Sequence, residues 1–273
     1  MQLEAGRTAA VTRAFYILLI AVFVLAPLFV VVAVSLNRVA FTAFPPRGLS
    51  LRWYQAVLTD PQWRASLTVS LWIAAVASLL AACAGTLGAI GLHRGRFPGR
   101  DALVAGFLSP IVLPGLITGL ALLFFFARLR WTGTNFALVL GHVVITFPYV
   151  LRVVLGSLVR ETATLEEAAM TLGADELTTF RRITLPLARP GILAGTIFAF
   201  IISFDNITIS LFLTAPRTVT LPIRILEHVQ WAGTPAVAAI SSLFVFLTVA
   251  LALVVERTVG LHRVVGEETV GFG

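Results

Sequence analysis

Long apolar runs, separated by charged or proline-containing stretches, divide this chain into segments. A helix that rises about 1.5 Å per residue needs about 20 apolar residues to cross roughly 30 Å of hydrocarbon. Six runs near this size are present, and each predicts a transmembrane helix: 14–36, 67–92, 102–127, 136–151, 191–213 and 237–255. The first is too long for the apolar core of a signal peptide and precedes no small-residue cleavage site, so we expect it to remain as an anchor.

The composition agrees with this pattern. Of 273 residues, 58% are hydrophobic and 12% are charged, and the mean hydropathy is +0.96. These values lie far from those of an ordinary soluble domain. We therefore predict an all-α polytopic membrane protein in which residues 1–273 form a single transmembrane domain.

The charged and metal-binding residues exclude several chemistries. All 20 basic residues are arginine, so a P-loop, which needs a lysine on the nucleotide phosphates, is absent. The single cysteine, Cys83, and four histidines without zinc-type spacing predict neither a metal site nor catalytic residues. Because the arginines flank the apolar runs, lipid headgroups are the expected partner and nucleic acid is not.

Arginine also indicates the orientation. With six spans, both termini and the second and fourth loops share one side and hold 12 arginines, while the other loops hold 8. The positive-inside rule places the first set, including both termini, in the cytoplasm.

Two regions interrupt the simple pattern of spans. In the loop 37–66, Ser50 is expected to cap a short helix whose Trp53 and Tyr54 lie at headgroup level, and Asp60 to cap the second span. In the third span, Pro110 and Pro114 predict a break or bend. That bend is either a packing kink or part of a translocation path.

The longest predicted cytoplasmic loop, 152–190, carries a helical pattern of small and apolar residues. Leu165, Ala168, Ala169 and Leu172 recur at helical spacing, Gly173 can end that helix, and Asp175 can cap a second one. Pro186 and Pro190 are expected to keep the second helix separate from the fifth span. A solvated linker is the alternative, but it would not need two capped helices.

The sequence from Glu167 to Pro190 resembles the EAA loop of the permeases of binding-protein-dependent ABC importers. The pattern is EAA, three residues, Gly, nine residues and I-x-LP, and its matches are Glu167, Ala168, Ala169, Gly173, Ile183, Leu185 and Pro186. Weaker similarity along most of the chain, including SPIVLPGLITGLALLF and SFDNITISLFLTAP, resembles the second permease of the spermidine/putrescine group.

This resemblance implies a type I importer subunit that forms half of a translocation path. The seven matching residues would couple to a dimer of separate ATP-binding subunits, which would hold ATP and Mg²⁺, so no cofactor is expected on this chain. The other implied partners are a second permease, more often a different chain, and an extracytoplasmic solute-binding protein. The implied location is the bacterial inner membrane.

Asp205 is the one acidic residue well inside a predicted span, which makes it a candidate for the substrate path. Ser203, Asn206 and Ser210 add polar atoms nearby, and Pro114 in the third span completes the candidate path. Alternatively, Asp205 pairs with Arg152 or Arg217, or caps a broken helix.

The substrate stays open at this stage. Polyamine members of the group often carry acidic residues at the positions of Gly115 and Asn206, so a monocationic, zwitterionic or anionic solute competes with a polyamine. A self-sufficient secondary transporter or channel is the alternative class, but a single buried acid gives it little coupling machinery. An intramembrane enzyme would need a nucleophile and base that the spans do not supply.

Overall fold

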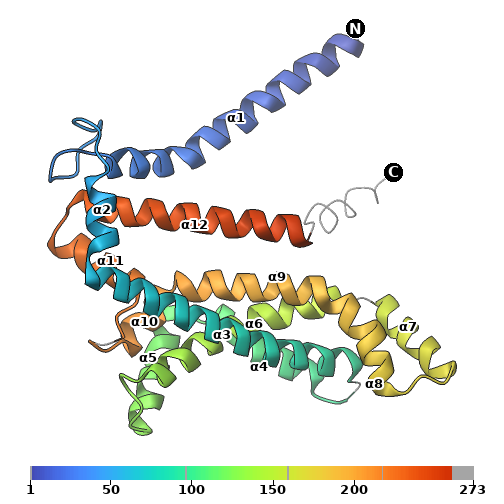
Figure 1. Cartoon of the computed structure of the whole chain (residues 1–273). Coiled ribbons are helices and arrows are strands. Elements are labelled where there is room, and N and C mark those ends of the chain that lie inside the picture. Colours follow the sequence, from blue (N-terminus) through green and yellow to red (C-terminus); the bar gives the residue numbers. More distant parts are fainter. Residues whose placement is uncertain (1, 96, 159, 217, 260–273) are drawn as a thin grey trace. The chain divides into compact units, whose positions relative to one another are not determined.

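A computed structural model describes residues 2–95, 97–158, 160–216 and 218–259. Every regular element within these ranges is a helix, which confirms the all-α prediction (Figure 1). The elements are α1 Gln2–Ser35, α2 Arg52–Thr59, α3 Pro61–Arg94, α4 Arg100–Val112, α5 Gly115–Arg128, α6 Asn135–Ser157, α7 Arg160–Thr171, α8 Glu176–Thr179, the π-helix η1 Phe180–Thr184, α9 Leu185–Phe204, α10 Ile207–Leu213, α11 Leu221–Trp231 and α12 Pro235–Val259.

The lengths of the apolar helices support a protein that crosses the membrane several times. Among the described residues, four helical segments are long and apolar enough to span: Thr12–Ser35, Pro61–Arg94, Asn135–Ser157 and Glu176–Phe204. The pair α4 and α5, bent by 104°, is a fifth candidate. The last predicted span lies in α12, whose described apolar part, Pro235–Ala250, is shorter. The total of six therefore stays a prediction.

The chain divides into two compact units, one formed by Met1–Arg64 and Ile225–Val249 and the other by Ala65–Arg224 and Ala250–Gly273. The prediction of a single transmembrane domain is not decided by this division. The candidate functional residues all lie in the second unit.

In the first unit, buried side chains hold the loop that follows α1. The Asn37 carboxamide accepts hydrogen bonds from the backbone N–H groups of Val39 and Arg47, and its backbone oxygen accepts one from Trp53 Nε1 at 2.9 Å. The Tyr54 hydroxyl is 2.7 Å from the hydroxyls of both Ser35 and Ser242. The polar atoms of both aromatic residues thus tie this unit together, a role that the headgroup prediction did not include.

The start of α3 confirms the predicted cap. Asp60 Oδ1 accepts hydrogen bonds from the N–H groups of Gln62 at 2.7 Å and Trp63 at 3.3 Å, which are the second and third residues of α3. The short helix α2 is also present, and Ser50 Oγ accepts from the N–H of Arg52 at its first residue.

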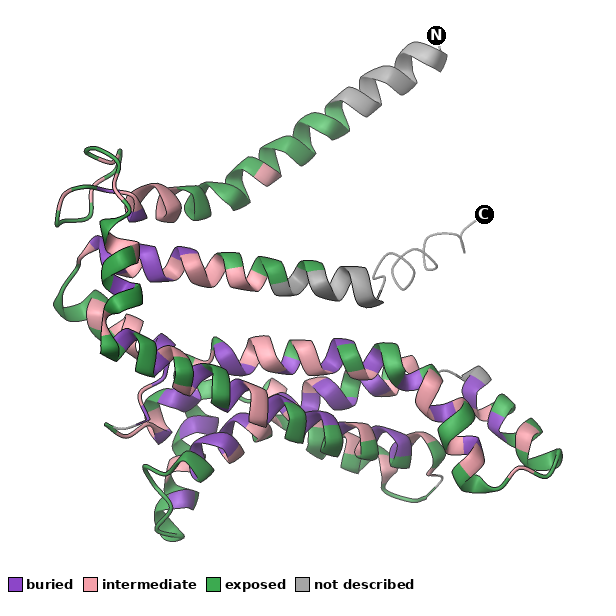
Figure 2. Ribbon diagram, in the orientation of Figure 1, coloured by how far each residue is buried: buried purple, intermediate pink, exposed green. Residues whose placement is uncertain are grey.

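The core of the second unit depends on small residues that allow helices to approach closely. Val150, in the buried middle of α6, faces Gly85 of α3 and Gly195 of α9. A Cβ built at Gly85 would lie 2.9 Å from Val150 Cβ, and one at Gly195 would lie 3.2 Å from Val150 Cα. Figure 2 shows the buried residues that accumulate along these helices. Close backbone contact of this kind is typical of helix packing in membranes.

Candidate functional site

The helix–turn–helix predicted in the 152–190 loop is present. Helix α7 ends at Thr171, and Gly173 two residues later has a φ of +91°, the left-handed conformation that glycine adopts without strain. The N–H of Gly173 bonds to the carbonyl of Met170 at 3.0 Å, and the N–H of Ala174 bonds to that of Ala169 at 3.0 Å. These two bonds satisfy carbonyls that the helix end would otherwise leave free, in the pattern of a Schellman motif.

The second helix of the loop begins where the sequence predicts. Asp175 occupies the N-cap position of α8, with extended backbone angles. A hydrogen bond with the Thr178 side chain holds the pKa of the Asp175 carboxyl below its ordinary value. The carboxylate is therefore charged at the positive end of the short helix.

The prediction that prolines separate this helix from the fifth span is wrong. Segment Glu176–Phe204 is continuous and helical, because α8 passes through the π-helix η1 directly into α9. The N–H of Leu185 bonds to the carbonyl of Phe180, five residues earlier, which widens the turn just before Pro186. A wider turn relieves the clash that a proline ring makes with the carbonyl four residues before it. Pro190 lies inside α9 without ending it.

The residues of the EAA pattern separate into two groups. Glu167 and Ala168 are exposed on α7, Ala169 is half-buried, and Leu172 at the helix end is 89% exposed. By contrast, the half-buried residues of the I-x-LP part lie along η1 and the start of α9: Ile183, Leu185 and Pro186. The first group offers an open surface on α7, and the second belongs to the continuous helix that leads into the fifth span.

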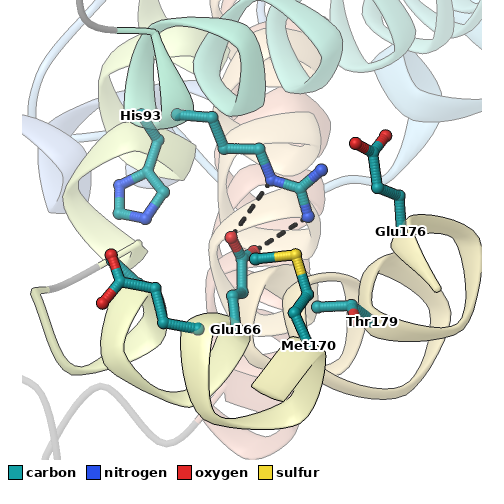
Figure 3. Close-up of a pocket in the computed structure, with 8 residues that line it drawn as sticks. His93, Glu166, Met170, Glu176 and Thr179 are labelled. Carbon is teal, nitrogen blue, oxygen red and sulfur yellow. Dashed lines mark hydrogen bonds and ion pairs between the residues drawn. The ribbon is translucent and has the colours of Figure 1, made fainter. Parts of the chain in front are cut away.

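Sequence reasoning missed the residue before Glu167. Glu166 is buried, with 6% of its surface exposed, and its carboxylate accepts two hydrogen bonds from Arg94 at the end of α3 (Figure 3). Arg94 Nε lies 3.1 Å from Glu166 Oε2, and Arg94 Nη2 lies 3.0 Å from Glu166 Oε1. Thr184, the last residue of η1, donates to Glu166 Oε1 and accepts from Arg94 Nη2 at 2.9 Å.

These contacts explain the charge state of Glu166. Burial by itself would raise the pKa of Glu166. The hydrogen bonds from Arg94 and Thr184 and the positive charge of Arg94 lower this pKa by more than burial raises it. The net result is a pKa below the ordinary glutamate value, so the carboxylate is charged at neutral pH. No sequence signal joined these residues, because 72 positions separate Arg94 from Glu166.

A pocket of about 420 Å³ lies beside this cluster. It is lined by residues of α3, α7 and α8: His93, Arg94, Ala163, Glu166, Glu167, Met170, Glu176 and Thr179. Figure 3 shows Glu176 and Thr179 on one side of the pocket and His93 on the other. Thr179 Oγ1 and His93 Nε2 are buried without a hydrogen-bond partner among the described residues.

The candidate path residues lie around two adjacent helix breaks. The third predicted span breaks between α4 and α5, where Pro114 is the N-cap residue of α5. The fifth breaks between α9 and α10 at Asp205 and Asn206. Helix α5 packs against α10, so a Cβ built at Gly115 would lie 3.5 Å from Thr208. The bend predicted from the prolines is confirmed, and it meets the break that follows Asp205.

The polar residues of the fifth span have different environments. Asp205 is exposed, and its carboxylate forms no ion pair within the described part of the chain; Arg152 is not its partner, and Arg217 lies outside that part. Asn206 caps α10 by accepting from the N–H of Ile209 at 2.7 Å. The helix is thus broken as one alternative expected, but Asn206 provides the side-chain cap.

The two serines of the fifth span, Ser203 and Ser210, are buried against a histidine. His142 of α6, 1% exposed, places Nδ1 2.8 Å from Ser203 Oγ and Nε2 3.2 Å from Ser210 Oγ. This histidine therefore joins the helices on both sides of the break. Of the polar residues predicted for the path in the fifth span, Asp205 is exposed and Asn206 is half-buried.

These features are those of a polytopic helical membrane protein with a capped helix–turn–helix and two broken apolar segments. The chain belongs to the family described as binding-protein-dependent transport system inner membrane component, whose model matches residues 83–261. It is 37% identical to the putrescine transport system permease protein PotI of Escherichia coli (strain K12) over 229 residues, which cover 81% of each chain.

Further relatives agree with this assignment. The spermidine/putrescine transport system permease protein PotC of Haemophilus influenzae is 32% identical over 226 residues, which cover 82% of this chain and 87% of that protein. A chain from the crystal structure of a bacterial ABC transporter involved in the import of the acidic polysaccharide alginate has the same fold, with a TM-score of 0.71 and 17% identity. That match covers 93% of this chain and 97% of the other.

Family membership establishes the general function. The chain is an inner-membrane permease subunit of an importer that depends on a binding protein, and the membership supports this class over a self-sufficient secondary transporter or channel. A separate ATPase and a solute-binding protein are the partners that such membership implies.

Proposed function

We propose that this chain forms half of the path for a small organic amine and couples to its ATPase through the exposed face of α7. Exposure carries this proposal: Glu167, Ala168 and Leu172 present a carboxylate and an apolar surface that no described residue of this chain covers. Glu167 would pair with a basic residue of the ATPase, and the small side chain of Ala168 would permit close approach. The ATPase dimer would bind ATP and Mg²⁺, and this chain would have no catalytic residue.

Assembly and uptake test the coupling role. In proteoliposomes with the ATPase, the second permease and the binding protein, Glu167→Arg should lower both ATPase retention and ATP-driven uptake. Asp101→Asn, which changes another exposed carboxylate in the first turn of α4, is the matched control. Unchanged retention and uptake in Glu167→Arg would show that α7 does not couple through this residue.

The names of the relatives support an amine substrate. The residues at the two helix breaks, between α4 and α5 and between α9 and α10, bear on how many positive charges that amine carries. Asp205 offers one exposed carboxylate, while Gly115 and Asn206 offer none. A desolvated dication needs more than one negative partner. We therefore place a monoamine or an amino-acid derivative beside putrescine as the second candidate.

Competition measurements separate these candidates. Uptake of labelled putrescine is measured with an excess of unlabelled putrescine or of a monoamine of equal length. If the importer carries a monoamine, the monoamine should reduce this uptake more strongly than putrescine does; if it carries putrescine, the reverse is expected. Asn206→Asp adds a carboxylate beside Asp205 and should favour the diamine over the monoamine. An unchanged preference would remove this break from the substrate path.

The remaining parts of the assembly are proposed on the same basis. The second permease is a different chain, and the 152–190 loop and both termini are cytoplasmic. Differently tagged copies of this chain should then fail to co-purify. A cysteine introduced at the exposed Leu177, which lies outside the proposed ATPase surface, should react with an impermeant thiol reagent in inverted vesicles and not in intact cells, whereas the opposite labelling would reverse the orientation.

A further inference from the structure

Two consecutive glutamates of α7 point in different directions. Adjacent residues of an α-helix are separated by about 100° around its axis, since each turn holds about 3.6 residues. Glu167 is exposed, whereas Glu166 turns inward and is buried against Arg94 and Thr184. Within the described residues, Glu166 is the one carboxylate that falls in the buried class.

The cluster joins three elements at one point. Arg94 is the last residue of α3, Glu166 lies in the middle of α7, and Thr184 is the last residue of η1. Arg94 bonds to both of the others, and Thr184 bonds to Glu166. A displacement of α7 therefore changes bonds to the second span and to the continuous helix of the fifth span at the same time.

The geometry makes this link stiff. Arg94 binds the carboxylate with two nearly parallel N–H groups, which fixes orientation as well as distance. Glu166 is desolvated, so removal of its partner would leave a buried charge without compensation. An exposed pair such as Arg100 with Asp101 lacks this constraint, because the Asp101 side chain is 98% exposed.

We propose that Arg94, Glu166 and Thr184 form the link through which movement of α7 reaches α3 and α9, with Glu166 and Arg94 as positioning residues. This inference rests on the proposed attachment of α7 to the ATPase. It assigns the outward glutamate to the partner subunit and the inward glutamate to transmission within this chain.

The test is a double-mutant cycle in the complete importer. Glu166→Gln, Arg94→Gln and the double variant are reconstituted with the ATPase, the second permease and the binding protein, with Asp101→Asn as the control. The measurements are ATPase retention, the thermal stability of the complex, and the number of ATP molecules hydrolysed per solute imported. Coupling between sites typically corresponds to about 5–150-fold.

The expected result is loss of transmission without loss of assembly. Each single variant should retain the ATPase and raise ATP consumption per solute by about tenfold. The double variant should be no worse than either single variant, because both changes remove the same link. Asp101→Asn should match the unmodified protein.

Three results would overturn the proposal. One is an unchanged ratio of ATP to solute in the single variants, and another is an additive loss in the double variant. The third is a parallel loss of uptake, ATP hydrolysis and thermal stability, which would show that the cluster only maintains the fold. The proposed attachment of α7 to the ATPase is tested separately: if it is wrong, the Glu167→Arg variant retains the ATPase fully.

Discussion

The approach of α3 to α6 at Gly85 allows a quantitative prediction. A Cβ built there lies 2.9 Å from Cβ and Cγ1 of Val150 and 3.1 Å from the backbone nitrogen of Leu151. Carbon atoms in contact normally rest at about 3.5–4.0 Å, so Gly85→Ala requires a local separation of at least about 0.6 Å. Val150 has little freedom to move away, because Gly195 of α9 approaches its Cα from another helix.

The size of the effect follows from two opposing contributions. Overpacking of a well-packed core costs about 1–3 kcal/mol, while replacing glycine by alanine inside a helix gains about 0.5–1 kcal/mol. Gly91→Ala isolates the gain, because it lies in the same helix and a Cβ there has no neighbour within 4 Å. Gly85→Ala should therefore be less stable than Gly91→Ala by about 1–3 kcal/mol.

Unfolding of the purified chain in mixed micelles, followed by tryptophan fluorescence as the denaturing detergent fraction rises, measures this difference. Gly85→Val should increase it further. Equal free energies of unfolding for Gly85→Ala and Gly91→Ala would refute the close approach of α3 and α6.

Three further predictions concern polar contacts. His142→Leu leaves two buried serine hydroxyls without a partner and should lower the free energy of unfolding by about 1–3 kcal/mol, measured in the same micelle assay; a variant as stable as the unmodified chain would contradict the contacts. The lowered pKa of Glu166 means that its ion pair stabilises the fold above the ordinary glutamate pKa and is lost as pH falls through the lower folded value; stability differences between Glu166→Gln and the unmodified chain should be constant from about pH 6 to 8 and shrink below about pH 4. Tyr54→Phe removes a hydroxyl bonded to two serines and should cost about 1 kcal/mol in thermal unfolding, whereas no change would show that these bonds contribute nothing.

Local signals in the sequence predicted the helix–turn–helix well. The end of α7 depends on one glycine with positive φ, and the start of α8 on one aspartate, so residues within a few positions determine both. Asp60 at the start of α3 follows the same logic. Apolar run length likewise predicted most of the long apolar helices of the described chain, since the bilayer sets the length that a helix needs, but the number and bounds of the spans stay predictions.

Contacts between distant positions were not predictable in this way. His142 is 61 and 68 residues from the serines that it bonds, and no spacing rule connects them. The prediction that prolines separate α8 from α9 was wrong for a different reason. The proline rule assumes regular α-helical turns, and the π-helix before Pro186 does not have them.

The continuity of α8, η1 and α9 makes the break at Asp205 sensitive to the angle of α9. Helix α9 has 20 residues, which at about 1.5 Å per residue extend roughly 30 Å from η1 to Asp205. If α9 pivots at η1, a tilt of about 5° moves its other end by about 2.6 Å, by the same helical rise. A small rotation beside the π-helix therefore shifts the break by about the length of a hydrogen bond.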